Sequence, residues 1–155
     1  MVEAGKLDLI RLADGESSLV VQVQSRHMPG VMPLHDYLDA VIVVTSGFAH
    51  GRLEVCLAPD DVDNWTEVLG ALAAGRNATW MDDGRNPELR FESFGQDGIG
   101  AVVVEDVAGS GTSIRVRVRL ADGWIDDHYQ RLHDVQASWP REVLETSPGA
   151  YEWRR

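Results

Sequence analysis

The chain has 155 residues, of which 44% are hydrophobic and 25% are charged, the usual composition of a single globular domain. Its formal net charge of -11 argues against direct binding to nucleic acid, because phosphate contacts require a basic surface. The longest apolar run, residues 40–44, is far shorter than the roughly 20 residues of a membrane-spanning helix, so we expect no membrane segment.

Alternating apolar and polar residues predict four strands in the first third of the chain. These strands are expected at residues 7–12, 17–26, 38–46 and 52–57. The Asp14-Gly15 turn signal joins the first two strands into a hairpin. Residues 38–46 are apolar on both faces, which is typical of a central strand.

Helical spacing of apolar residues begins at Pro59, where Asp60 and Asp61 favour the positive start of a helix. This pattern predicts a helix over residues 59–74. A four-strand meander is expected next, at residues 78–81, 89–94, 101–106 and 112–120. A second apolar stripe predicts a helix over residues 123–139 that stops at Pro140.

Together these elements predict an α+β fold, in which an antiparallel β-sheet carries two α-helices packed on one face. We expect a single domain over residues 1–140 and a C-terminal tail over residues 141–155. The tail has no hydrophobic period, and its terminal position favours fraying over an anchoring role for Tyr151 and Trp153.

Sequence motifs for nucleotides, metals and hydrolase chemistry are absent. The glycine-rich stretch at residues 109–112 lacks the lysine and the following helix of a phosphate loop, so it is interpreted as a hairpin turn. The five histidines have no ligand spacing, and His128 and His133 point apart on their predicted helix. We therefore expect neither a bound metal nor a cofactor.

The only local group with an acid, a base and a phenol is His35, Asp36 and Tyr37, together with Asp39, just before the central strand. His35, Asp36 and Tyr37 are candidate catalytic residues. The competing interpretation is structural, because polar residues at a strand entry commonly form turns and caps. Cys56 has no neighbour in sequence that would lower its thiol pKa, so we expect an inert thiol.

Negative charge is concentrated in the middle of the chain, where residues 58–106 contain eleven acidic and three basic residues. This segment favours a basic protein or peptide as a partner, although a solvated surface that serves solubility remains the alternative. The candidate binding residues are Asp60, Asp61, Asp63, Trp80, Asp82 and Asp83. Arg115 and its alternating neighbours are expected to pair with acidic residues across the sheet rather than to bind an anion.

Several stretches resemble an uncharacterised actinobacterial family of Streptomyces type, a domain of unknown function. They comprise Leu34–Leu38 with Thr45–Phe48, the helix Pro59–Gly75, Trp80–Asp83 and Ala121–Asp126. The resemblance covers about residues 7–140, and a basic set of thirteen Arg and one Lys is typical of a GC-rich genome. The element order is also similar to that of WapI-type immunity proteins of polymorphic toxins, and that resemblance implies a protein that neutralises a toxin by binding.

We therefore expect a non-catalytic, immunity-protein-like binding protein that recognises a basic protein or peptide. One alternative is a small tailoring enzyme or accessory protein in peptide natural-product maturation, for example in lysinoalanine-type crosslinking. A dimeric scaffold, joined as a homodimer through an exposed sheet edge, is another. The single Cys56 and the absence of an apolar leader in residues 1–12 predict a cytoplasmic location.

Overall fold

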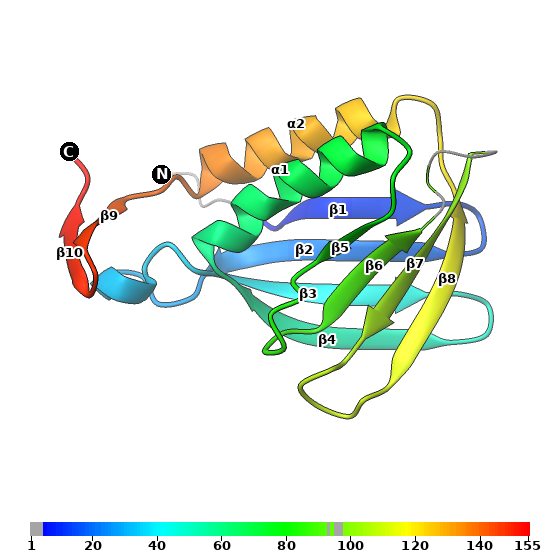
Figure 1. The fold of residues 1–155 in the computed structure, drawn as a ribbon, viewed down its shortest axis with the longest axis horizontal. Helices are drawn as coiled ribbons and strands as arrows, with labels where there is room; N and C mark the ends of the chain where they lie inside the picture. The colour runs from blue at the N-terminus through cyan, green and yellow to red at the C-terminus, as the bar shows by residue number, and fades with distance from the viewer. Residues whose placement is uncertain (1–4, 93, 95–97) are drawn as a thin grey trace.

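The computed structural model describes residues 5–92, 94 and 98–155 (Figure 1). The first sheet contains, in order, β1 (Leu7–Ala13), β2 (Ser18–Arg26), β3 (Leu38–Thr45) and β4 (His50–Leu57). The second sheet contains β5 (Ala78–Trp80), β6 (Glu88–Glu92), β7 (Ile99–Glu105) and β8 (Ser113–Arg119). The remaining elements are η1 (Met32–Leu34), α1 (Pro59–Ala73), α2 (Trp124–Ser138), β9 (Val143–Ser147) and β10 (Ala150–Trp153).

The α+β class is confirmed, and all strand pairs are antiparallel in the described residues. Strands β1–β8 divide between two four-stranded sheets, however, instead of forming the single sheet that the sequence predicts, and β9 and β10 form a separate two-stranded sheet. The meanders β1–β4 and β5–β8 each have one apolar face that has to be buried. Stacking the two sheets buries both faces in one core, whereas a single sheet joined edge to edge would leave these faces exposed. The sheets approach closely at Gly51 of β4, where a Cβ atom would lie 3.1 Å from Ile114 Cδ1 of β8.

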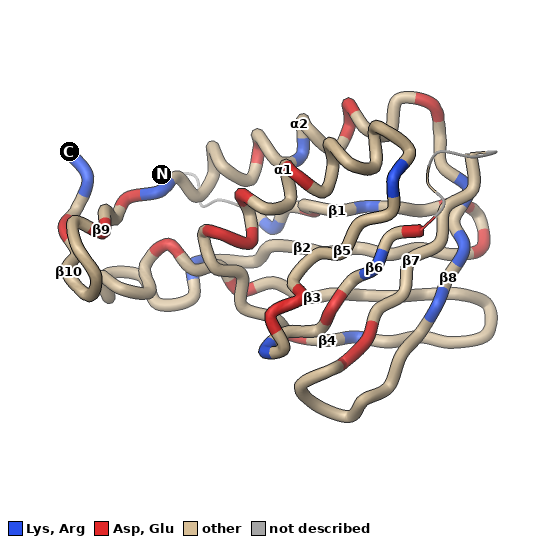
Figure 2. Tube along the Cα trace, viewed as in Figure 1, with Lys and Arg blue, Asp and Glu red and all other residues tan. Residues whose placement is uncertain are grey.

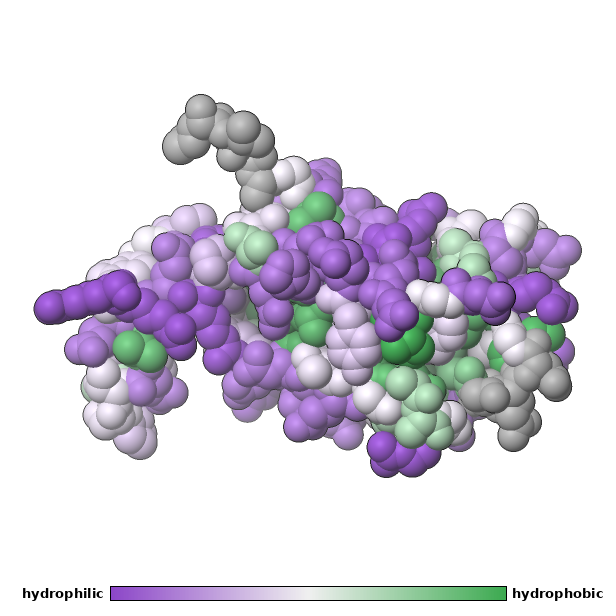
Figure 3. Space-filling model, turned by 90° about the horizontal axis from the view of Figure 1, so that it is seen from above, coloured by the Kyte–Doolittle hydropathy of each residue, from purple (hydrophilic) through white to green (hydrophobic). Residues whose placement is uncertain are grey.

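The two helices lie side by side on the same side of the first sheet, next to the second sheet (Figure 1). Helix α2 packs against the edge strand β1, and α1 packs against β5. Each helix buries one apolar stripe, as predicted, with the polar remainder facing outward. Seen from the helix side, the surface is mainly hydrophilic and is interrupted by small apolar patches (Figure 3). Neither helix combines the length and the apolar character needed to cross a membrane.

A cluster of aromatic rings joins the helices to the second sheet. The ring of Trp65 on α1 lies 5.3 Å from Trp80 of β5 and 5.4 Å from Phe91 of β6, and it lies 6.5 Å from His128 on α2. Trp65 is 1% exposed, so these contacts are inside the core. One tryptophan therefore holds three elements that are separate in sequence.

Charged side chains on the outer face of the second sheet form ion pairs across its strands. Arg90 of β6 lies 3.5 Å from Glu105 of β7, and Arg115 of β8 pairs with Glu92 of β6. The expected cross-strand pairing is therefore confirmed for these residues. Figure 2 shows the charged residues of these strands, with basic residues along β8 and acidic residues on β6 and β7.

The C-terminal tail forms a hairpin, which corrects the expectation that it frays. β9 and β10 pair over residues 143–153, with the turn at Gly149, whose φ of 79° suits glycine. Most of the side chains of this hairpin are exposed, so it has no hydrophobic period for sequence reasoning to find. Residues far away in the sequence attach it to the rest of the fold.

A buried histidine closes the edge of the first sheet. His128 is 1% exposed, its Nε2 accepts a hydrogen bond from the backbone N–H of Arg11 at 3.1 Å, and its Nδ1 lies 2.7 Å from the carbonyl of Trp124. A carbonyl oxygen can only accept, so Nδ1 carries the donated proton; because Nε2 accepts from Arg11 and carries none, the ring is neutral. Burial lowers the pKa of His128, although the hydrogen bond to Trp124 opposes that effect. The histidine thus satisfies a strand N–H that would otherwise remain open at the sheet edge.

Replacing Leu132 by alanine is expected to lower the free energy of unfolding by about 2–5 kcal/mol, and Trp65→Ala by about 3–5 kcal/mol, because both changes open cavities in the core. Both side chains are buried. Phe48 is 100% exposed, so Phe48→Ala is the matched control and should change stability by less than about 0.5 kcal/mol. Urea unfolding followed by circular dichroism measures all three, and equal effects of Leu132→Ala and Phe48→Ala would contradict the core described above.

The lowered pKa of His128 predicts a loss of stability in mild acid. Below its ordinary value of 6.5, the unfolded chain binds a proton at this position that the folded chain does not, so the free energy of unfolding falls as the pH falls. The slope should approach about 1.4 kcal/mol per pH unit from this group. His128→Gln should reduce the slope below pH 6.5, whereas His133→Gln, at an exposed position on α2, should retain it. Identical slopes in the two variants would refute this assignment.

Candidate functional site

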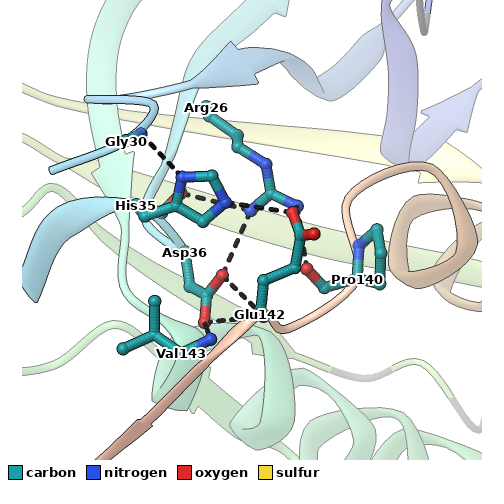
Figure 4. Close-up of polar contacts among 7 residues, drawn as sticks. All are labelled: Arg26, Gly30, His35, Asp36, Pro140, Glu142 and Val143. Atoms are coloured by element: carbon teal, nitrogen blue, oxygen red, sulfur yellow. Dashed lines mark hydrogen bonds and ion pairs between the residues drawn. The ribbon is translucent and has the colours of Figure 1, made fainter. Parts of the chain in front are cut away.

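The C-terminal hairpin is attached by Arg26, at the end of β2. Its guanidinium donates to the carboxylate of Asp36 at 3.1 Å and to Glu142 at 2.7 Å (Figure 4). It also donates to the carbonyl oxygens of His35 at 3.1 Å and Pro140 at 2.8 Å. The Arg26 and Asp36 side chains are 12% and 9% exposed, so their charged bond is largely desolvated, whereas Glu142 is 50% exposed and its bond to Arg26 is open to solvent. We refer to Arg26, His35, Asp36 and Glu142 as the hairpin clamp.

Asp36 fixes the first residues of the hairpin through their backbone. Its carboxylate accepts hydrogen bonds from the backbone N–H of Glu142 at 3.0 Å and of Val143 at 3.0 Å. The Asp36 side chain is 9% exposed and is paired with Arg26. A carboxylate occupied in this way has a structural task, which is to hold the first residues of the hairpin.

Both nitrogens of the His35 ring are also engaged in the clamp. Nδ1 accepts a hydrogen bond from the backbone N–H of Gly30 at 2.8 Å, and Nε2 lies 3.0 Å from Glu142 (Figure 4). The Trp153 ring of β10 meets the His35 ring edge-on, with 4.8 Å between the centroids. The structure therefore brings His35 and Asp36 together, in an arrangement that favours the structural interpretation of these residues over the catalytic one.

A groove lies between the C-terminal hairpin and the start of α1. This hairpin groove has a volume of about 260 Å³. Its lining includes the apolar and aromatic residues Met32, Tyr37, Leu144 and Tyr151, the acidic residues Asp60 and Glu145, and the basic residues Arg141 and Arg154. Tyr37, the third candidate catalytic residue, is thus a wall of the groove and lies beside the clamp. Leu144 and Tyr151 are 39% and 38% exposed, so apolar and acidic side chains share an open surface.

The acidic segments at the start of α1 and after β5 are held together by Trp80. Its Nε1 donates to the backbone carbonyl of Asp61 at 2.8 Å. Met81 follows with φ 60°, the one positive φ of a non-glycine residue in the described part of the chain, and turns the backbone towards Asp82. Trp80 itself is 1% exposed, which corrects its expected role as an exposed contact: a ring at the centre of the core cannot meet a partner.

The carboxylates of the predicted acidic residues differ in whether other groups of the protein already bond to them. Asp61 accepts a hydrogen bond from the backbone N–H of Ala58 at 2.8 Å and caps α1. Burial raises the pKa of Asp61; the bond from Ala58 lowers it, and the negative charge of Asp83 raises it further. Burial opposes the lowering of the Asp83 pKa, but hydrogen bonds from the following turn outweigh it and keep Asp83 charged. Asp63 forms an ion pair with Arg141 at 2.6 Å.

Asp60 and Asp82 are exposed, and no described residue pairs with their carboxylates. Figure 2 shows the acidic segments at the start of α1 and in the turn after β5 on the same side of the molecule. We refer to Asp60, Asp61, Asp82 and Asp83 as the acidic face. Two of its four carboxylates hold backbone turns, so Asp60 and Asp82 are the ones available to a partner.

A second polar group lies on the solvent face of the first sheet. His27, Asp39 and Cys56 each place a possible ligand atom within 4.8 Å of the others, and His27 Nδ1 lies 2.7 Å from Asp39 Oδ1. Sequence spacing gives no sign of this group, because its members meet through the register of three strands. Burial, and then the charges of Asp39 and Asp61, raise the pKa of the Cys56 thiol, the opposite of what an activated nucleophile requires.

Several residues of the clamp escape sequence reasoning. Arg26 and Glu142 are separated by 116 positions, and neither belongs to a recognisable motif. The only sequence signal is the polar group at His35 and Asp36, which indicates hydrogen bonding at this place but does not identify the partner. The partner turns out to be the end of the same chain.

Asp36→Ala should release the C-terminal hairpin and leave the two sheets intact. The lost hydrogen bonds to a charged group are worth about 1.5–3 kcal/mol, so amide hydrogen exchange over residues 142–153 should rise about 10- to 100-fold. Asp63→Ala is the control, because it removes only the exposed ion pair to Arg141 and should cost no more than about 1 kcal/mol. Equal exchange rates in the two variants would show that the clamp does not hold the hairpin.

Comparison with known proteins identifies a family without assigning a function. No curated protein and no solved structure shows significant similarity to the chain. A family model described as a family of unknown function, DUF5959, matches residues 7–140, which is the extent of the resemblance expected from the sequence. This match covers most of the chain, including both sheets and both helices but not the C-terminal hairpin. The chain therefore belongs to the DUF5959 family.

Proposed function

We propose that this protein is a non-catalytic binding protein that recognises a basic segment of another protein or a peptide. The observation that carries the proposal is the position of Asp60, which belongs both to the acidic face and to the lining of the hairpin groove. A basic side chain paired with Asp60 would bring its neighbouring residues over the groove. Apolar residues of the partner could then contact Leu144 and Tyr151.

The charge distribution supports a basic partner over an acidic one. Arg141, which also lines the groove, is neutralised by Asp63, and Asp36 is neutralised by Arg26. The other charged residues of the lining are two acidic residues, Asp60 and Glu145, and one basic residue, Arg154, so the balance is negative. The exposed carboxylate of Asp82 on the acidic face adds to this negative potential. Charges of this kind speed the encounter with a cationic segment and fix its orientation more than they add affinity.

The hairpin clamp supports a binding role over the tailoring-enzyme alternative. Its candidate acid and base, Asp36 and His35, are engaged in bonds that hold the hairpin, so using either in catalysis would require the groove wall to come apart. Immunity-like action is the specific form of the proposal, in which the partner is a toxin that is neutralised by occupation of its surface in the cytoplasm. The homodimer through a sheet edge, with β4 as an edge strand of the first sheet, stays a prediction.

A synthetic peptide that alternates arginine and leucine is a suitable probe for this site. The Asp60→Asn/Asp82→Asn variant should lower the association rate constant about three- to tenfold at low ionic strength, because it removes the free charges of the acidic face. Asp61 and Asp83 are retained because their carboxylates hold backbone turns. Surface-immobilised peptide and stopped-flow mixing provide the rate, and the difference should shrink at 0.15 M salt, where the screening length is about 8 Å.

The matched control is Asp122→Asn/Asp126→Asn, which changes the net charge equally at exposed positions at the start of α2. This variant should bind the peptide at a rate close to that of the unaltered protein. An equal loss of association rate in both variants would show that the peptide responds to net charge alone. No loss in either variant would show that the acidic face does not take part in binding. Either result would refute the proposal.

A further inference from the structure

Three adjacent strands of the first sheet bring three different metal-binding side chains to its solvent face. His27 follows β2, Asp39 belongs to β3 and Cys56 belongs to β4. Asp39 stands opposite Cys56 in the β3–β4 register, and the backbone N–H of His27 donates to the carbonyl of Tyr37 at 2.8 Å, which keeps the end of β2 against β3. The backbone of the sheet thus fixes the position of all three residues.

The separations of the donor atoms suit a tetrahedral metal ion. With metal–ligand bonds of about 2.0–2.3 Å, the ligand atoms of a zinc site lie about 3.3–3.6 Å apart. Here the His27–Asp39 pair is at 2.7 Å, so its hydrogen bond has to open by about 0.6 Å to admit the ion. The three atoms lie within 4.8 Å of one another, so the widest pair has to close by at most about 1.5 Å. The His27 and Asp39 side chains are 38% and 45% exposed, and rotation of these side chains meets solvent and not a packed core.

An open hollow beside the three residues admits a hydrated cation. It has a volume of about 440 Å³, and Asp39 and Cys56 are part of its wall. Glu54 and Asp106 add two further carboxylates to the wall, and among the described residues Arg85 is its one cationic side chain. The excess of negative charge favours a divalent cation over an anion at this place.

We propose that His27, Asp39 and Cys56 bind one Zn²⁺ ion, with water in the fourth coordination position. A thiolate and an imidazole favour zinc over Mg²⁺ and Ca²⁺, which prefer a complete set of oxygen ligands. Three protein ligands and one exchangeable position are the arrangement of zinc sites that take up a further ligand. This site is separate from the hairpin groove, because none of its three residues lines that groove.

Titration of tag-free, metal-stripped protein with Co²⁺ tests the site and reports its ligands. One Co²⁺ per chain should bind, with the visible bands of tetrahedral cobalt and the near-ultraviolet band of thiolate-to-cobalt charge transfer, and Zn²⁺ should displace it. Cys56→Ser should abolish the charge-transfer band. His27→Ala and Asp39→Asn should each weaken Zn²⁺ binding, measured by calorimetry, by at least about tenfold.

His133→Ala is the matched control, because it removes an exposed histidine on α2 and should leave Zn²⁺ affinity unchanged. Circular dichroism establishes that each variant is folded, and Cys56→Ala replaces Cys56→Ser if the serine variant is not. The absence of Co²⁺ binding, or a charge-transfer band that persists without Cys56, would overturn the proposal. These results do not depend on the peptide measurement, which alters Asp60 and Asp82 only.

Discussion

The packing of Trp65 against rings from three other elements is the contact on which the rest of the structure depends. This one side chain places α1 against the second sheet and against α2 at the same point, beside the other buried residues of the helix. The junction also reaches the surface, because Trp80 packs on Trp65 and donates to the carbonyl of Asp61. A core contact therefore determines where the acidic face lies.

Polar bonds attach the C-terminal hairpin to the fold, whereas apolar packing holds the core elements together. The strands β9 and β10 are largely exposed and bury too little apolar surface to dock by the hydrophobic effect. The hairpin clamp supplies charged hydrogen bonds, and its Arg26–Asp36 pair lies where solvent reaches poorly and such bonds are strongest. Because Arg26, His35 and Asp36 lie inside the region matched by the family and Glu142 lies beyond it, the clamp is built from both parts of the chain.

Two surfaces of the molecule are thus prepared for different chemistry. The hairpin groove combines exposed apolar side chains with unpaired carboxylates, which suits a basic protein segment. The solvent face of the first sheet gathers sulfur, nitrogen and oxygen donors, which suits a transition-metal ion. The two surfaces share no described side chain, so the two proposals can be tested independently.

The sequence by itself determined the elements and their local pairing. Both helices, both meanders and the turn at Asp14-Gly15 follow from periodicity and turn residues, because these signals act between neighbours in the chain. It could not determine that the meanders form two stacked sheets, that Trp80 is buried, or that residues 143–153 dock as a hairpin. Only the tertiary structure decided these features, and it also brought Arg26 to Glu142 and His27 to Cys56, since contacts between distant residues depend on how the layers pack and leave no period in the sequence.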